Sequence, residues 1–471
     1  MEVTMIGHAS LFVKTQNCQI LMDPVLWDPH QEGLFDIFPS REVLFDRLPS
    51  INFLVLSHRH LDHFDIRSLA ALPKNVNVII PKDLFLERYL RQLGYNKITM
   101  LKDFSEVKIG PTVLLTTRSE NPVPEYGMVF ADESGVFWNQ VDSVVAPATV
   151  RRVLSRFPKI DLLLASWQPM LEANFQINAS VSFPHKRYGD TLYNIGLVSP
   201  GTLAPGANGF RYTRAATWMN QVVFPVSRER FMEDAKTACP AINSIASLDP
   251  GDKFQIHNGI SKHEAGVSDF VRRLGDGNRA LLDFSPVTAG GPLVDDNPEG
   301  VPEQELQATV VHAIEERLAT CLHLNSAHFD TNRLWKVIYQ LQVVLPSNQL
   351  LWNIDFSGNE PRLQRGRNPL ANVFTIMTGS SIHALSNGTR GWDYAILGGY
   401  CRRFQKLYSA GSHGILAGHE AGIVDPLDMT FPFQECAERF LDNEVKRWSQ
   451  VPADTLPQDH EALVTIPGGM S

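Results

Sequence analysis

The sequence predicts an α/β protein with two domains, and three observations support this. The chain has 471 residues, which exceeds the length of about 250 to 300 residues at which a single hydrophobic core stops growing. Over residues 1–145, short β-rich runs alternate with turns and with segments of helical periodicity. After a turn-rich stretch near residue 300, a long helical pattern and further strand-like runs follow.

The first domain is expected to cover residues 1–300. Its strand-like runs are residues 2–7, 10–15, 19–23, 51–57, 76–81, 97–101, 112–117, 127–132 and 135–142. Apolar residues recur at helical spacing in residues 65–72, 83–95 and 147–157. Residues 160–265 are rich in Pro and Gly, so we expect mainly loops there, as the remainder of this domain.

The second domain is expected to be smaller and of the α+β class. Residues 303–324 carry the clearest helical pattern of the chain, and residues 333–345 continue it. We therefore expect a helical linker or dimerisation segment over 301–345, with a homodimer as one outcome. Strand-like runs and a helix at 433–449 then place the α+β domain at 346–471.

Composition excludes several classes of protein. The net charge of −9, without any block of Lys or Arg, argues against nucleic acid as a partner. No apolar stretch is long enough to span a membrane, and the start lacks a secretory signal, so we expect a cytoplasmic location. The five cysteines are scattered without a C-x-x-C pair, which predicts reduced thiols. Cys321 and His323 have the spacing of half a Rieske motif, but the matching second pair is absent.

The chemistry of the chain is concentrated in SHRHLDHFD, residues 57–65, which follows the apolar run INFLVL. Side chains at the end of a buried strand can be turned toward one point. His58, His60, Asp62 and His63 offer four ligands in six residues, more than one tetrahedral ion needs from one loop. This predicts two metal ions. The alternative is that these are solvated loop residues or buried structural histidines.

This motif, with GHASLFV and ILMDP before it, resembles the metallo-β-lactamase superfamily over about residues 1–260. The resemblance implies an αββα sandwich with metal ions at the sheet edges. It implies that His58 and His60 bind one metal, and that Asp62 and His63 bind the second. It also implies a third histidine downstream, a bridging aspartate after the next hairpin, and a final histidine later.

The sequence departs from that pattern in two places. No histidine lies between His63 and the hairpin, and Glu120 stands where the third histidine is expected. Asp142 matches the bridging aspartate. The final histidine is also missing from residues 197–210, so the second metal would keep an open position, with His185 and His257 as alternative ligands. Glu125, at a strand start, is expected to be solvated.

A glutamate in place of a histidine changes the chemistry of the site. Three histidines with three carboxylates form an oxygen-rich set that suits iron or manganese better than zinc. The set is similar to the diiron branch of this fold, represented by the β-hydroxylase of chloramphenicol biosynthesis. The order of FWNQVDS, SPGTLAPGANGF and LDPGDKF is similar to the corresponding part of CMP-sialic acid hydroxylases. The C-terminal region is similar to a sterol-carrier-protein-like domain.

Two enzyme functions follow, with identical ligands. The first is a non-heme diiron monooxygenase that uses O₂ to hydroxylate a small molecule, with Glu120 and Asp142 as catalytic residues. Its electrons would come from a separate reductase or from the substrate. The second is a zinc or manganese hydrolase of an ester, lactone or phosphodiester, in which two metals activate water. A relative with degenerate metal sites is a third interpretation, which the intact loop from His58 to His63 disfavours.

Other polar residues have two interpretations each. His8 is expected either to support a metal ligand by a hydrogen bond or to be a buried structural histidine. His185, Lys186 and Arg187 would bind an anionic substrate or form a solvated loop. His257 follows a strand-like run and is otherwise structural.

Overall fold

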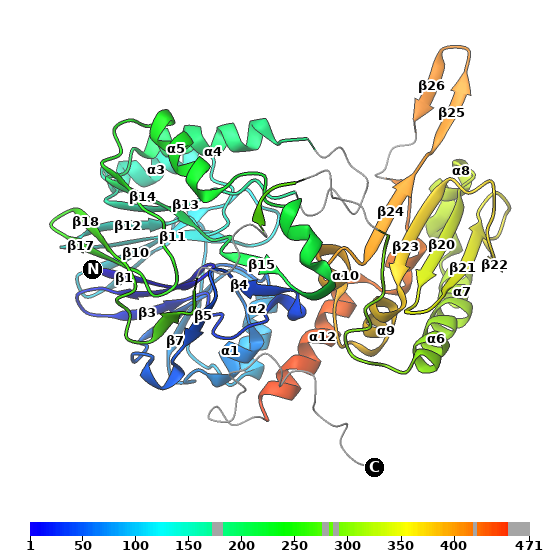
Figure 1. The fold of residues 1–471 in the computed structure, drawn as a ribbon, viewed down its shortest axis with the longest axis horizontal. Coiled ribbons are helices and arrows are strands. Elements are labelled where there is room, and N and C mark those ends of the chain that lie inside the picture. Colours follow the sequence, from blue (N-terminus) through cyan, green and yellow to red (C-terminus); the bar gives the residue numbers. More distant parts are fainter. Residues whose placement is uncertain (172–181, 276–281, 286–291, 418–421, 451–471) are drawn as a thin grey trace.

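Two stacked β-sheets form the N-terminal part of the computed structural model, and a third sheet with its own helices forms the C-terminal part (Figure 1). The structure describes residues 1–171, 182–275, 282–285, 292–417 and 422–450. Within these residues, no helix has both the length and the apolar character needed to cross a membrane.

The first sheet has eight strands in the order β18-β17-β1-β2-β3-β6-β7-β8. From β18 to β3 the neighbours are antiparallel, and from β3 to β8 they are parallel. The bounds are β1 Glu2–Gly7, β2 Ser10–Lys14, β3 Gln19–Met22, β6 Phe53–Val55, β7 Asn77–Pro81, β8 Ile98–Leu101, β17 Lys253–His257 and β18 Ile260–Glu264.

The second sheet has seven strands in the order β16-β14-β13-β12-β11-β10-β9. Strands β9 to β12 are antiparallel, and β12 to β16 are parallel. The bounds are β9 Glu106–Ile109, β10 Thr112–Arg118, β11 Tyr126–Asp132, β12 Gly135–Asn139, β13 Leu162–Ser166, β14 Thr202–Gly206 and β16 Ser244–Ile245.

Three hydrophobic cores hold these layers together. The core between the sheets joins residues such as Leu11 and Ile20 of the first sheet to Met128 and Leu164 of the second. A second core packs helices α1 (Ile66–Ala71) and α2 (Leu84–Gln92) on the outer face of the first sheet. A third packs α3 (Pro147–Arg156), α4 (His185–Val198) and α5 (Arg228–Ala238) on the second sheet. The expected αββα sandwich is confirmed.

The helices that flank the ligand loop begin at side-chain caps. The Asp65 carboxylate accepts a hydrogen bond from the Ser68 N–H at the start of α1, and Asp83 accepts from Phe85 and Leu86 at the start of α2. Such caps satisfy backbone N–H groups that have no partner inside the helix. They fix where the loop after β6 ends.

Short elements complete the first domain. Two-stranded pairs join β4 (Phe35–Ile37) to β15 (Phe210–Tyr212) and β5 (Arg41–Val43) to β19 (Val271–Arg273). The 3-10 helices here are η1 Gln31–Gly33, η2 Phe45–Arg47 and η4 Arg214–Gln221. Residues 160–265 are therefore not mainly loops as expected, since they hold β13 to β18 and two long helices. The Pro and Gly residues of this region instead separate closely spaced elements.

The C-terminal domain is built on a five-stranded sheet in the order β22-β21-β20-β23-β24. Its strands are β20 Ile338–Val344, β21 Gln349–Asp355, β22 Arg362–Arg365, β23 Val373–Thr378 and β24 Cys401–Gln405, with a separate hairpin of β25 Tyr408–Gly411 and β26 Gly414–Ala417. Its helices are α6 Glu303–His312, the π-helical η7 Ala313–Leu318, α7 Ala319–Leu324, the 3-10 helix η8 Ser326–Phe329, α8 Asp330–Leu334, α9 Gly379–Asn387, α10 Trp392–Leu397, α11 Pro426–Thr430 and α12 Phe433–Trp448. The likeness to a sterol-carrier protein stays a prediction.

Residues 301–345 differ from the expected helical linker. Leu306, Val310 and Ile314 of the long helix pack in the same core as Tyr339 and Leu341 of β20. The helix is thus part of the second domain, because its apolar stripe covers the sheet. Residues 338–344 form a strand rather than a helix, and their alternating Tyr339, Leu341 and Val343 face this core.

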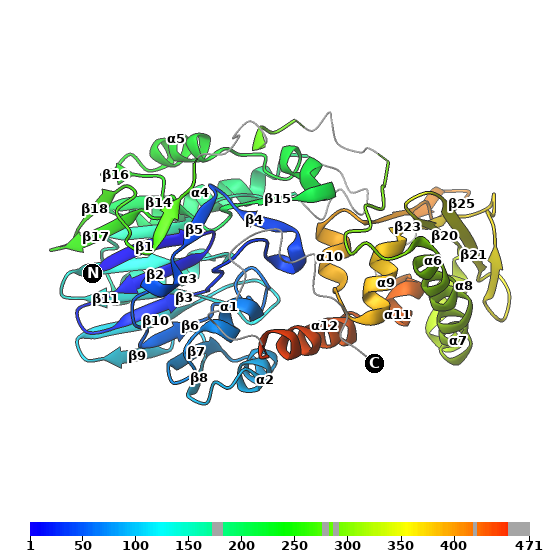
Figure 2. The ribbon, with the colours of Figure 1, turned by 60° about the horizontal axis from the view of Figure 1, so that its bottom comes forward.

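Helix α12 joins the two domains (Figure 2). Phe440, Leu441, Val445 and Trp448 pack into the core beneath α1 and α2. The Tyr89 hydroxyl of α2 donates to the backbone oxygen of Glu438 at 3.1 Å. A second shared core places Tyr394 and Tyr400 of the C-terminal domain among aromatic residues of the first domain. The C-terminal domain is therefore fixed beside the edge at which the ligand loop lies.

Candidate metal centre

The loop after β6 carries the predicted ligands and is held in a tight turn. The N–H groups of His63 and Phe64 both donate to the backbone oxygen of His60, at 2.9 and 2.8 Å. Arg59 points outward and forms two hydrogen bonds with Asp83, at 2.6 and 2.7 Å. With Arg59 turned away, the side chains of His58, His60, Asp62 and His63 can converge on the other side of the loop.

Four side chains from three segments meet at this edge. Ligand atoms of His8, Asp62, His63 and Asp142 all lie within 4.8 Å of one another. Nε2 of His8 is 3.1 Å from Oδ2 of Asp62, and Nε2 of His63 is 3.1 Å from Oδ2 of Asp142. This group can hold a metal ion, and it joins the ligand loop to the loop after β12.

His58 and His60 lie beside this group. Nε2 of His58 is 2.8 Å from Nδ1 of His60, and the His58 ring centroid is 4.1 Å from that of His63. The structure thus brings together the four predicted residues of the loop and Asp142. Two neighbouring ion positions are compatible with this spread of donors.

His8 was expected either to support a ligand by a hydrogen bond or to be structural; its contact with Asp62 fits the first alternative, and it belongs to the cluster itself. It lies in the turn between β1 and β2 with a φ of 52°, and the Gly7 before it has a φ of 148°. A side chain at Gly7 would lie 2.5 Å from Ile37, so only glycine fits this turn. The turn directs the imidazole of His8 toward Asp62.

Asp23, at the end of β3, orients two of the histidines. Its carboxylate accepts hydrogen bonds from the Ser57 N–H and hydroxyl, both at 2.7 Å, and lies 3.0 Å from Nδ1 of His63. The Ser57 hydroxyl is 2.9 Å from Nδ1 of His58. A carboxylate behind a ligating histidine fixes its ring and turns the other nitrogen to the metal. The run ILMD was the only sequence signal for this residue.

Strong electrostatic coupling is visible in the pKa values. Burial opposes ionisation of Asp62 and Asp142, but neighbouring histidines, chiefly His63, hold the pKa of Asp62 well below its usual range and that of Asp142 at about 2. Burial alone would lower the pKa of His63, yet Asp62, Asp142 and Asp23 raise it well above its usual value. Burial, with His63 and His60 nearby, lowers the pKa of His58. The carboxylates therefore stay ionised beside the histidines, which is the charge state that binds a cation.

The two glutamates differ from expectation. Glu120 is 42% exposed and forms an ion pair with Arg118 at 3.0 Å, away from the cluster. Glu125 is 5% exposed and not solvated. The N–H of the next residue, Tyr126, donates to the backbone oxygen of Ser57 at 3.3 Å, which brings Glu125 beside the ligand loop.

Glu125 is also adjacent to Asp142. Burial raises its pKa, and the nearby charge of Asp142 raises it further. Asn121 donates to Oε2 of Glu125 at 2.6 Å and to the backbone oxygen of Asp142 at 3.4 Å. Among the described residues, Oε1 of Glu125 and Oδ1 of Asp142 are buried without a hydrogen bond of normal geometry. Unsatisfied carboxylate oxygens beside several histidines fit a metal centre.

The remaining predicted residues lie outside the cluster. His185, Lys186 and Arg187 form the exposed first turn of α4. His257 is exposed at the end of β17, with Nε2 3.3 Å from Nδ2 of Asn258. The structure therefore brings neither His185 nor His257 to the cluster, which His8 joins instead.

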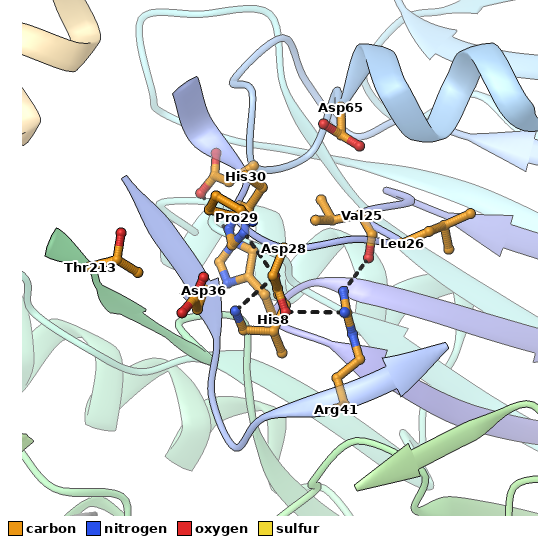
Figure 3. A network of polar contacts seen from close by, with 12 residues as sticks. His8, Val25, Leu26, Asp28, Pro29, His30, Asp36, Arg41, Asp65 and Thr213 are labelled. Carbon is orange, nitrogen blue, oxygen red and sulfur yellow. Dashed lines mark hydrogen bonds and ion pairs between the residues drawn. The ribbon is translucent and has the colours of Figure 1, made fainter. Parts of the chain in front are cut away.

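A buried polar network next to His8 was also missed by sequence reasoning (Figure 3). The Asp28 carboxylate accepts from Arg41 at 3.2 Å and from the Ile37 N–H at 3.0 Å, and lies 3.5 Å from Nδ1 of His30. The rings of His30 and His8 are stacked with centroids 6.2 Å apart. This network supports the wall behind His8.

Comparison with known proteins agrees with this geometry. Residues 2–146 match the family model described as the β-lactamase superfamily domain, so this part of the chain carries a domain of that superfamily. The domain has the metallo-β-lactamase fold, with an additional C-terminal domain of helices and strands.

Relatives of this chain carry different names. A protein of Mycobacterium tuberculosis named as a Rieske 2Fe-2S iron-sulfur protein is 28% identical over 188 residues, which are 36% of this chain and 36% of that protein. A Flavobacterium johnsoniae protein named UPF0173 metal-dependent hydrolase is 28% identical over 115 residues, 23% of this chain and 46% of that one. The chain thus spans about a third of the length of the first of these relatives and less than half of the second.

Among solved structures, CmlA, a diiron β-hydroxylase from Streptomyces venezuelae, is similar with a TM-score of 0.34 and 16% identity. The similarity covers 44% of this chain and 45% of that one.

Proposed function

We propose that this protein is a non-heme diiron oxygenase that uses O₂ to hydroxylate a small-molecule substrate. The observation that carries the proposal is the buried carboxylate of Glu125 beside Asp142, in the same segment between β10 and β11 in which the resemblance implies a histidine. With Asp62, it gives the site three carboxylates. Such oxygen-rich donor sets favour harder ions, including iron, over zinc.

The ligands divide between two ion positions. We assign His58, His60 and Glu125 to the first position and Asp62, His63 and His8 to the second, with Asp142 between them. Glu125 replaces Glu120 in this assignment because the Glu120 side chain is exposed and paired with Arg118. Iron, when bound, would supply the redox chemistry that activates O₂.

The protein supplies orientation and exclusion of water. Asp23 and Ser57 hold the rings of His58 and His63, and the tight turn at Gly7 holds His8. His8, His58 and His63 are buried and thus shielded from solvent, whereas His60 lies at the exposed side of the site. Preorganised ligands of this kind reduce the rearrangement that metal binding requires.

Electrons must come from outside the described site. The name of the mycobacterial relative, a Rieske 2Fe-2S iron-sulfur protein, supports an association of this domain with electron transfer. The present chain has Cys321 and His323 but no matching second pair, so a separate reductase is the proposed electron donor.

A metal-dependent hydrolase is the second candidate. The Flavobacterium relative is named as a metal-dependent hydrolase, and His8 raises the number of imidazole donors to four, which zinc accepts readily. In that case the same residues would hold two zinc or manganese ions that activate water toward an ester, lactone or phosphodiester.

The two glutamates provide a matched test of the proposal. Glu125→Ala should lower bound iron by about one ion per chain, because it removes a ligand oxygen, and should abolish O₂ uptake by the reduced, iron-loaded protein. Glu120→Ala should leave both near the wild-type value. Iron content is measured by elemental analysis and O₂ uptake with an oxygen electrode.

Two outcomes would count against the proposal in different ways. Loss of iron in Glu120→Ala with retention in Glu125→Ala would overturn the ligand assignment. An iron-loaded wild-type protein that consumes no O₂ after reduction would favour the hydrolase.

A further inference from the structure

Two cavities lie beside the metal centre and share a wall. Trp167 and Gln168, which follow β13, line both of them. The first cavity includes His8 in its lining, and the second includes Ser143, the residue after Asp142. A ligand that reaches the metal centre is therefore next to two compartments.

The first compartment, which we call the apolar arm, has mainly hydrophobic walls. Its hydrophobic lining includes Met5, Phe38, Phe210, Phe224, Val226 and Leu248, and its charged lining residues are Arg228, Glu229 and Asp283. Phe210 meets the His8 ring edge-on with centroids 5.2 Å apart, and Phe224 lies 5.5 Å from Phe210. Concave apolar walls with few polar groups are typical of sites for small organic molecules.

The second compartment, which we call the basic arm, opens at the start of α4. His185, Lys186 and Arg187 line this opening, and the first turn of the helix has no acidic residue. Pro184 caps the helix without a side-chain hydrogen bond, and the His185 N–H donates to the backbone oxygen of Phe183, so the N–H groups of Lys186 and Arg187 are the ones that face no side-chain cap. A helix N-terminus with free N–H groups and cationic side chains attracts anions.

Polar atoms in the wall provide an independent indication of a ligand. Trp167 is 6% exposed and Asn194 is 8% exposed. Nε1 of Trp167 and Oδ1 of Asn194 have no hydrogen-bond partner among the residues that the structure describes, and both residues line the basic arm. Buried polar groups are normally paired, so an unpaired donor and acceptor here indicate a polar group brought by a ligand.

The ion pair at the helix start does not block this role. Nζ of Lys186 is 2.6 Å from Asp190, but the two side chains are 90% and 62% exposed. Exposed pairs of this kind are weak and rearrange easily. The Arg187 backbone oxygen accepts from the Thr191 hydroxyl at 3.2 Å, whereas its exposed guanidinium has no ion pair with a described residue that would compete with an anion.

From these features we infer that the substrate is a small amphiphilic anion, with an apolar body in the apolar arm and a carboxylate or phosphate group in the basic arm. The inference rests on the proposed function, because it places the reacting part of the molecule between the arms, at the metal centre. It goes beyond that function by naming the substrate class.

Ligand binding by the metal-loaded, full-length protein tests this directly. Tryptophan fluorescence is followed during titration with octyl phosphate, octanoate, octanol and inorganic phosphate. We expect at least one of the two amphiphilic anions to bind about tenfold more tightly than octanol and than inorganic phosphate. A preference between octyl phosphate and octanoate distinguishes the two anionic groups.

Variants test how much the basic arm contributes to ligand affinity. The Lys186→Ala/Arg187→Ala double variant should lose about tenfold in affinity for the preferred anion and bind octanol unchanged, since both side chains are on the surface. Since the chain has eight tryptophans, Trp167→Phe identifies the reporter and should remove most of the fluorescence change. Lys108→Ala, on the exposed edge strand β9, is the control and should bind like wild type.

Three results would overturn the inference. These are equal affinity for octanol and both anions, unchanged anion affinity in the double variant, and an equal loss in Lys108→Ala. Because binding needs no turnover, such a failure would leave the metal chemistry intact. Conversely, a metal centre that fails the oxygen test could still bind the amphiphile.

Discussion

Asp23 is not a metal ligand in the proposed assignment, but it orients two of the histidines that are. It is fully buried and binds Ser57 and His63, and through Ser57 it reaches His58. One carboxylate therefore orients a histidine at each of the two ion positions. Its loss should weaken both sites together.

We predict that Asp23→Asn lowers metal affinity by about 10- to 100-fold, the usual effect of removing a partner behind a ligating histidine. Asparagine keeps the shape of the side chain but not the charge that holds His63. Affinity is measured by competition with a chelator. Asp46→Asn, at an exposed position in η2, is the matched control. Equal metal affinity in Asp23→Asn and wild type would show that Asp23 does not orient the ligating histidines.

At the residue scale, the sequence predicted the ligands of the loop after β6, but not all of the residues from other segments that complete the site. His58, His60, Asp62 and His63 are adjacent in sequence, so their spacing alone predicted a shared site. Glu125 and His8 join through strand pairing and a bulged turn between β1 and β2. Those are non-local contacts that spacing cannot reveal, although GHAS and the strand start EYGMVF marked the positions.

Elements were predictable where the pattern was local. Helices α1, α2, α3 and α12 lie inside the residue ranges expected from the sequence. Their apolar periodicity is clear, and α1 and α2 begin at an aspartate cap. Residues 338–344 were wrongly predicted as a helix. The segment IYQLQVV follows a true helix, and its alternation of apolar and polar residues is too short to identify a strand. Pairing with β21 and β23 decides that this segment is a strand.

Helices α4 and α5 were hidden for a different reason. Their apolar residues are diluted by polar ones, and short loops rich in Pro and Gly surround them. Packing on the second sheet, through residues such as Ile195 and Phe231, stabilises them more than their own pattern does. Sequence reasoning therefore located the cations of α4 but placed them in a loop.

At the scale of the whole molecule, the two domains meet at a titratable contact. Oε2 of Glu32, near the metal edge, accepts the Gly391 N–H of the C-terminal domain at 2.6 Å, and Arg390 donates to the Glu32 backbone oxygen. Burial, and then the charge of Asp393, raises the pKa of Glu32 to about 8, against the opposing effects of the Gly391 N–H and Arg390. Glu444 raises it further.

This shift predicts a pH dependence of stability. A carboxyl group whose folded pKa is raised favours the protonated folded state, so its contribution is complete below the unfolded pKa and is lost as the pH rises toward about 8. Between pH 5 and 8, wild type should lose stability relative to Glu32→Gln, by at most about 1.4 kcal/mol per pH unit. Urea unfolding at several pH values measures this.

Glu305→Gln, at an exposed position of α6, should follow the wild-type pH profile. If Glu32→Gln has the same pH slope as wild type, the Glu32 carboxyl does not titrate in this range.

The metal content of protein purified without added metal, together with its optical spectrum, tests the central claim most directly. We expect about two irons per chain, with near-ultraviolet absorption that bleaches on reduction, because three carboxylates and four histidines converge at this edge. About two zincs per chain, with no such absorption, would contradict the oxygenase and make hydrolysis the function of the same ligands.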